Sequence, residues 1–173
     1  IRRASGKEAA DYVEAVYEGY APHGIAVLVE TASDNPTRTV SNLRTYFNKG
    51  NGALANSGSV AFLFKRVGVF RLEPAKLNAE ELELELIDHG LEEMGDSTGE
   101  KGEPQILIRC SYADFGTLQK ALEDRHITPI SAELEYLPLT PVELSEKEAN
   151  EALALIDKLE QDDDVQKVFH NLA

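Results

Sequence analysis

The chain has 173 residues, a formal net charge of −14, 42% hydrophobic and 28% charged residues, and one cysteine, Cys110. This composition is typical of a soluble globular protein, and no apolar run reaches the roughly 18 residues of a membrane-spanning helix. A single cysteine excludes an intrachain disulfide and a cysteine-based zinc site and fits a reducing compartment, so we expect a cytoplasmic protein with no membrane partner.

The negative charge is concentrated in the second part of the chain. Residues 1–66 contain eight Lys/Arg and six Asp/Glu, whereas residues 67–173 contain nine and twenty-five. Because binding to nucleic-acid phosphates requires Lys and Arg, only the first part favours nucleic acid as a partner. The alternative is that the acidity serves solubility alone.

The first elements are predicted to be two strands and a helix. Asp11–Tyr20 is rich in Tyr and Val, and Ile25–Thr31 is an apolar run of strand length, so both predict strands. Asn35 is suited to cap a helix that has Pro36 at its first position. Gly50 is suited to end that helix.

The predicted helix has two different faces. An apolar stripe at core spacing consists of Val40, Leu43 and Phe47. The opposite, polar face consists of Arg38, Asn42, Thr45 and Lys49.

The glycine-rich segment Gly50–Ser59 predicts a flexible loop that leads into a strand at Val60–Phe64. It does not match a phosphate-binding loop, because no Gly-Lys-Ser/Thr follows the glycines and no helix begins there. The chain also lacks Gly-x-Ser-x-Gly and His-Glu-x-x-His, and its four histidines are far apart in sequence. We therefore expect no enzymatic activity, metal, cofactor or small-molecule substrate.

Residues 67–139 predict a second unit. Pro74–Met94 contains the alternating sequence ELELEL, but its length and its strong helix formers favour a helix. A polar turn is expected at Asp96–Pro104. The remaining elements are expected to be a strand at Gln105–Tyr112, a helix at Ala113–Arg125 and a strand at Thr128–Leu137.

The last elements are predicted to return to the first unit. Ser145 and Glu148 form a capping box for a final helix, and Val165–His170 predicts a final strand. We therefore expect an α+β fold with two ferredoxin-like α+β domains, the second inserted into the first. The domains are residues 11–66 plus 140–173 and an acidic insertion of residues 67–139.

Exposed cations and amides in the first part predict a nucleic-acid-binding surface, with Arg and Lys contacting phosphates and Asn adding hydrogen bonds. The candidate residues are Arg38, Asn42, Arg44, Lys49, Asn51, Lys65 and Arg66. The alternative is that these are scattered surface charges. No aromatic strand of the RRM kind is present, so base stacking on a sheet is not indicated.

The stretch from Tyr17 to Phe64 carries a long, ordered series of motifs. They are a YEGYAP turn (Tyr17–Pro22), a hydrophobic strand (Ile25–Thr31), the helix start SDNPTRTV (Ser33–Val40), a glycine-rich loop (Lys49–Gly58) and the strand GSVAFLF (Gly58–Phe64). A further motif, DVQKVFHN (Asp164–Asn171), lies near the end of the chain. Together they closely resemble the YebC/PmpR family, which includes the mitochondrial translational activator of cytochrome c oxidase subunit I. Ala21 and Ser33 depart from the Gly and Thr of the family pattern.

The resemblance implies a basic N-terminal helical domain followed by two α+β domains, the third inserted into the second. Residues 1–10 would be the remnant of the first domain. The resemblance also implies a non-enzymatic regulator of gene expression, either a DNA-binding transcriptional regulator or a ribosome-associated translation factor that relieves stalling.

Expected partners are DNA, ribosomal RNA or the ribosome, and we expect a monomer. The alternative is a protein-interaction module that works through the acidic inserted domain without contacting nucleic acid.

Overall fold

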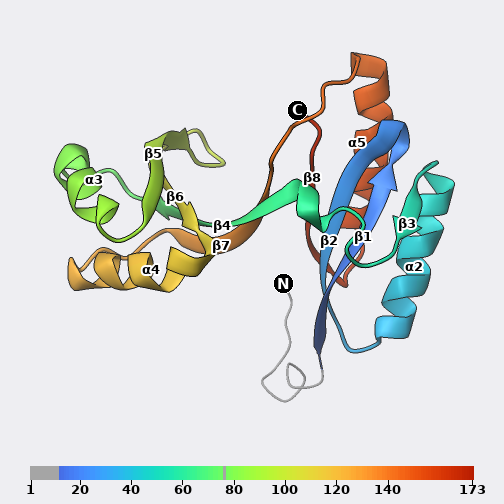
Figure 1. Cartoon of the computed structure of the whole chain (residues 1–173), viewed down its shortest axis with the longest axis horizontal. Coiled ribbons are helices and arrows are strands. Elements are labelled where there is room, and N and C mark those ends of the chain that lie inside the picture. The colour runs from blue at the N-terminus through green and yellow to red at the C-terminus, as the bar shows by residue number, and fades with distance from the viewer. Residues whose placement is uncertain (1–11, 76) are drawn as a thin grey trace. The chain divides into compact units, whose positions relative to one another are not determined.

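The computed structural model describes residues 12–75 and 77–173, which divide into two units (Figure 1). Unit 1 combines the chain up to Lys65 with the segment from Pro138 onward, and unit 2 is Arg66–Leu137. The α+β class and the inserted arrangement are confirmed, because each unit has a four-stranded sheet and the last strand joins the first sheet. The expectation for residues 1–10 lies outside the described residues.

Unit 1 is one sheet packed against two helices. Its elements are β1 (Val13–Ala21), η1 (Pro22–Gly24), β2 (Ile25–Ser33), α2 (Pro36–Lys49), β3 (Ala53–Ala55), η2 (Ala61–Leu63), α5 (Glu146–Glu160) and β8 (Val165–His170), with strand order β3-β1-β2-β8. Ile25, Val27 and Val29 of β2 alternate toward one face of the sheet. They form a buried cluster with Leu43 of α2 and Leu159 of α5, so both helices cover this face.

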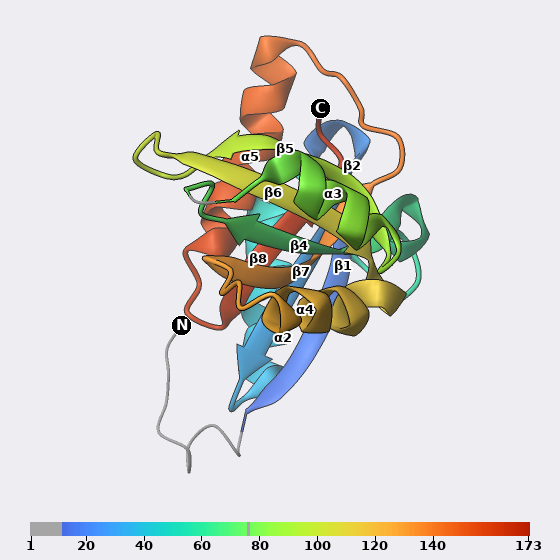
Figure 2. The same ribbon diagram turned by 90° about the vertical axis from the view of Figure 1, so that its left-hand side faces the viewer.

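Unit 2 has the β-α-β-β-α-β element order of ferredoxin-like folds. Its elements are β4 (Phe64–Leu72, which begins in unit 1), α3 (Ala79–Ile87), β5 (Leu91–Thr98), β6 (Pro104–Ser111), η3 (Tyr112–Asp114), α4 (Phe115–Asp124) and β7 (Ser131–Pro138), with strand order β5-β6-β4-β7. Phe70 and Ile108 of the sheet are buried against Leu86 of α3 and Leu122 of α4. Figure 2 shows both helices on the same face of this sheet.

The predicted strand at Val60–Phe64 is wrong. Ala61–Leu63 forms a 3-10 turn, and the strand begins at Phe64 and continues to Leu72. The reason is the side chain of Glu18, which accepts hydrogen bonds from the backbone amides of Val60 (2.8 Å) and Ala61 (2.9 Å). These amides are therefore used in a turn rather than in a strand ladder.

Two further predictions are corrected. The helix expected over Pro74–Met94 is confined to Ala79–Ile87, and the start of the expected polar turn belongs to β5, where Asp96 pairs with Ile106. The helix ends at Ile87, and Gly90, with a positive φ of 100°, lies in the turn that leads into β5. The loop Gly50–Ser59 contains the short strand β3, which pairs with β1.

Candidate functional site

Arg38 and Asn42 lie on the face of α2 that contacts the turn after α5. Arg38 donates to Asp164 from Nε (3.2 Å) and Nη2 (2.8 Å), and also to Asp34 (3.0 Å). Asn42 donates to Asp162 at 3.4 Å. These two predicted site residues are therefore engaged by carboxylates of the chain itself.

The bonds around Asp164 explain why a carboxylate is stable there. Burial alone would raise the pKa of Asp164, but hydrogen bonds from Arg38 and Thr39 lower it below its ordinary value. Thr39 donates to the same carboxylate at 2.8 Å. Thr39 is therefore buried together with Leu43 and Phe47. Val40, which was expected in the apolar stripe, is only partly buried.

Arg44, Lys49 and Asn51 are exposed. In the described ranges 12–75 and 77–173, neither Arg44 nor Lys49 forms an ion pair, so their charges are available to a ligand. Lys49 is the last residue of α2, and Asn51 follows with a left-handed backbone (φ 63°). Of the seven predicted residues, these three fit direct contact with an anionic partner best.

Lys65 and Arg66 are adjacent exposed residues of β4 that fall in different units. Within unit 2, the guanidinium carbon of Arg66 lies 4.2 Å from the centroid of the Tyr112 ring and 5.7 Å from that of Tyr136. The side chain of Tyr112 is half exposed. This stacked arginine and tyrosine form a second polar-aromatic surface that the sequence motifs did not indicate.

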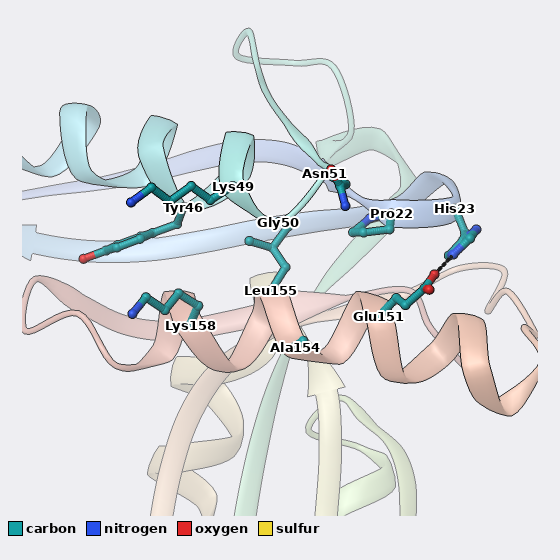
Figure 3. Close-up of a pocket in the computed structure, with 10 residues that line it drawn as sticks. All are labelled: Pro22, His23, Tyr46, Lys49, Gly50, Asn51, Glu151, Ala154, Leu155 and Lys158. Carbon is teal, nitrogen blue, oxygen red and sulfur yellow. Dashed lines mark hydrogen bonds and ion pairs between the residues drawn. The ribbon is translucent and has the colours of Figure 1, made fainter.

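A pocket of about 710 Å³ lies in unit 1 (Figure 3). The end of α2, the turn η1 and one face of α5 form its walls. Its lining residues are Pro22, His23, Tyr46, Lys49, Gly50, Asn51, Glu151, Ala154, Leu155 and Lys158. Two predicted residues, Lys49 and Asn51, are thus brought together with Lys158, which sequence spacing could not place beside them.

The two ends of the pocket differ chemically. At one end, the ammonium of Lys158 lies 5.9 Å from the centroid of the Tyr46 ring. The Tyr46 hydroxyl donates to Asp162 at 2.6 Å, and this bond, with burial, raises the pKa of Tyr46 to about 12. At the other end, His23 Nε2 lies 2.5 Å from the Glu151 carboxylate.

Glu18 organises the glycine-rich loop and was missed at the sequence level. Its carboxylate is almost fully buried and accepts hydrogen bonds from the backbone amides of Gly58 (2.7 Å), Val60 and Ala61. Burial would raise the pKa of Glu18, but these donors lower it. The available signal was a glutamate inside a strand of aromatic residues, where a buried charge needs partners.

The described residues contain no group of three or more His, Cys, Asp and Glu side chains suited to hold a metal ion. In the same part of the chain, every helix is too short or too polar to cross a membrane.

Comparisons with known proteins point to one family over nearly the whole described chain. The family described as "TACO1/YebC second and third domain" matches residues 12–172. A "Probable transcriptional regulatory protein" of Myxococcus xanthus is 62% identical over 173 residues, which are all of this chain and 72% of that protein. One of the same printed name from Cytophaga hutchinsonii is 51% identical, covering 100% of this chain and 71% of the relative.

A solved structure is also similar. The crystal structure of the conserved hypothetical protein Aq1575 from Aquifex aeolicus superposes with a TM-score of 0.77 at 32% identity. The match covers 94% of this chain and 65% of the Aquifex chain. The chain therefore spans about two thirds to three quarters of the length of the proteins that it matches.

Proposed function

The chain belongs to the family of the TACO1/YebC second and third domain, and from this premise we propose that it is a non-enzymatic regulator of gene expression that binds DNA or ribosomal RNA. Its relatives are named probable transcriptional regulatory proteins. The observation that carries the proposal is the pair of exposed cations Arg44 and Lys49 on one helix of an otherwise acidic chain, neither of which forms an ion pair within residues 12–75 and 77–173. The protein acts in the cytoplasm and as a monomer.

The two cations supply phosphate contacts, and Asn51 adds a hydrogen bond to the backbone of the nucleic acid. In unit 2, the guanidinium of Arg66, stacked on Tyr112, offers a flat surface on which an unpaired base can stack. Lys65 adds a further positive charge on β4. Arg38 and Asn42 act indirectly, because they hold α2 against the turn that contains Asp162 and Asp164.

The test is the salt dependence of binding by the double variant Arg44→Ala/Lys49→Ala. Fluorescence anisotropy measures binding of a labelled DNA duplex and of a labelled ribosomal RNA fragment between about 50 and 200 mM salt. We expect weaker binding and, on duplex DNA, a log–log slope that is shallower by roughly 0.9 for each phosphate that the variant no longer neutralises.

The matched control is Lys120→Ala/Lys147→Ala, which removes the same net charge from exposed positions on α4 and α5. It should leave the slope close to that of the wild type. An unchanged affinity and slope in the Arg44/Lys49 variant would contradict the proposed role of this surface. Crosslinking in cells then separates the two nucleic acids, since it recovers either promoter DNA or ribosomal RNA.

A second candidate function is a protein-interaction module that works through unit 2. The observation in its favour is on α3, where Leu84 is 71% and Ile87 is 54% exposed. Glu80 and Glu83 lie one turn before Leu84 and Ile87 on the same helix, so a basic partner with apolar side chains would fit this face. Pull-downs before and after nuclease treatment separate the alternatives, because only a protein partner remains bound after nuclease.

A further inference from the structure

The pocket of unit 1 has the size and the apolar floor of a small-molecule site. Its volume of about 710 Å³ falls in the range of roughly 300–1,000 Å³ that such sites occupy. Pro22, Ala154 and Leu155 supply apolar surface. Gly50 allows the end of α2 to approach α5 closely, because a Cβ at this position would lie 2.9 Å from Leu155 Cδ1.

One end of the pocket is suited to an anion. Figure 3 shows the side chains of Lys49 from α2 and Lys158 from α5 reaching toward the same end, on either side of Tyr46. Within the described chain neither ammonium forms an ion pair. The nearby carboxylate of Asp162 accepts hydrogen bonds from Tyr46 and from the backbone amide of Asp164 (2.8 Å), so neutral donors rather than either lysine are its hydrogen-bond partners.

The opposite end is suited to a neutral polar group. His23 and Glu151 form a hydrogen-bonded pair there, and Glu148 lies 3.7 Å from the other ring nitrogen of His23. An imidazole and a carboxylate offer a donor and acceptors to the edge of a heterocycle.

The backbone around the pocket is held in an unusual conformation. His23 (φ 69°) and Asn51 (φ 63°) are two of the three non-glycine residues with positive φ in the described part of the chain, and both line this pocket. Such conformations are costly for non-glycine residues and cluster at ligand sites. This observation is independent of the charge pattern and points to the same place.

We propose that this pocket binds a nucleoside monophosphate, either free or as the phosphorylated end of a nucleic-acid strand. The phosphate lies between Lys49 and Lys158, and the base lies on Ala154 and Leu155 with its polar edge toward His23. The version in which a strand end binds rests on the proposed function, because it requires that the protein binds nucleic acid. The version in which a free nucleotide binds does not require this.

Calorimetric titration of the whole chain tests the ligand class. The probes are AMP, adenosine, inorganic phosphate, and a single-stranded tetranucleotide with and without a 5′-phosphate. We expect saturable binding of AMP or of the phosphorylated tetranucleotide, and affinities at least about tenfold lower when the phosphate or the nucleoside is missing. Binding of AMP without competition by the phosphorylated tetranucleotide assigns a free nucleotide, and competition assigns a strand end.

Two variants test the location. Lys158→Gln should lower the affinity about tenfold, and Ala154→Trp, a change at an exposed position of α5, should abolish binding by filling the pocket. Lys147→Gln removes the same charge from the same helix outside the pocket and should have no effect. Circular dichroism checks that each variant is folded.

The proposal is overturned if neither AMP nor the phosphorylated tetranucleotide binds, if inorganic phosphate binds as tightly as AMP, or if Lys158→Gln and Ala154→Trp leave binding unchanged. Failure of the pocket proposal is distinguishable from failure of the proposed function. If only the pocket proposal fails, salt-dependent binding of long DNA or RNA through Arg44 persists. If only the proposed function fails, that binding is absent while free AMP still binds.

Discussion

Arg38 and Asp164 depend on each other for their place in unit 1. Asp164 is 6% exposed, and a buried carboxylate is tolerated only with charged or hydrogen-bonding partners. Arg38 supplies two of its hydrogen bonds and Thr39 a third. An Arg38→Ala variant would therefore weaken the packing of α2, so a loss of ligand binding in that variant would not identify a phosphate contact. Arg44, which is exposed and unpaired within the described residues, is the informative position.

Glu18 should make the stability of the protein depend on pH in the acid range. Its folded pKa lies below the ordinary value of 4.5, so the unfolded chain takes up this proton first. The stabilisation by Glu18 is therefore complete above about pH 4.5 and is lost as the pH falls through the lower folded pKa.

The matching variant is Glu18→Gln, which keeps the size of the side chain but loses one acceptor for the loop amides. At pH 7 we expect its free energy of unfolding to be about 1–3 kcal/mol lower than that of the wild type, and the difference should shrink on acidification. Urea unfolding followed from pH 7 to pH 3 measures both effects. Glu14→Gln, an exposed change on the same strand, is the control, and a constant difference across this pH range would contradict the assignment.

At the scale of elements, the approach of β3 to β1 depends on Gly52. A Cβ at this position would lie 2.2 Å from the carbonyl oxygen of Tyr20 and 2.9 Å from Leu155 Cδ2. The backbone oxygen cannot move without disturbing the pairing of Tyr20 with Ala53. We expect Gly52→Ala to lower the free energy of unfolding by about 1–3 kcal/mol, measured by urea titration.

Gly116 of α4 provides the comparison for Gly52→Ala, since a Cβ there would have no neighbour within 4 Å. Gly116→Ala should leave stability unchanged or raise it by roughly 0.5–1 kcal/mol. Equal losses in the two variants would show that the loss at Gly52 does not arise from the close approach.

The elements that local chemistry determines could be predicted from the sequence. Asn35 caps α2 through its side chain, and Ser145 with Glu148 forms the capping box of α5. The strand β8 also has the predicted bounds. The turn at Ala61 could not be predicted, because it depends on a hydrogen bond to Glu18, 43 residues earlier in the chain.

The candidate site shows the same division between local and distant causes. The exposure of Arg44 and Lys49 follows from their positions on an amphipathic helix. The pairing of Arg38 with Asp164 joins residues 126 positions apart, so sequence spacing gave no sign of it. The pocket likewise depends on Lys158 and Glu151 of α5, which only the folded chain brings to the end of α2.

At the scale of the whole molecule, the chain has two separate hydrophobic cores. The buried cluster of unit 1 contains Leu43 and Leu155, that of unit 2 contains Leu82 and Leu122, and the two clusters share no residue. A domain with its own core can in principle fold alone. Insertion of unit 2 within unit 1 is therefore compatible with each unit having its own stability.

Because the two cores are separate, we expect a substitution that leaves a cavity in the core of one unit to destabilise that unit and not the other. Leu122 of unit 2 is fully buried, and Leu122→Ala should lower the stability of that unit by about 2–5 kcal/mol. Native-state hydrogen exchange resolves the effect by position, because exchange free energies report local and sub-global opening. Amides of β4, from Val67 on, and of β6 should lose protection, while amides of β1 and β2 keep theirs. Leu43 of unit 1 is also fully buried, so the variant Leu43→Ala should give the opposite pattern. Equal loss of protection in both units from either variant would show that they unfold as one cooperative body.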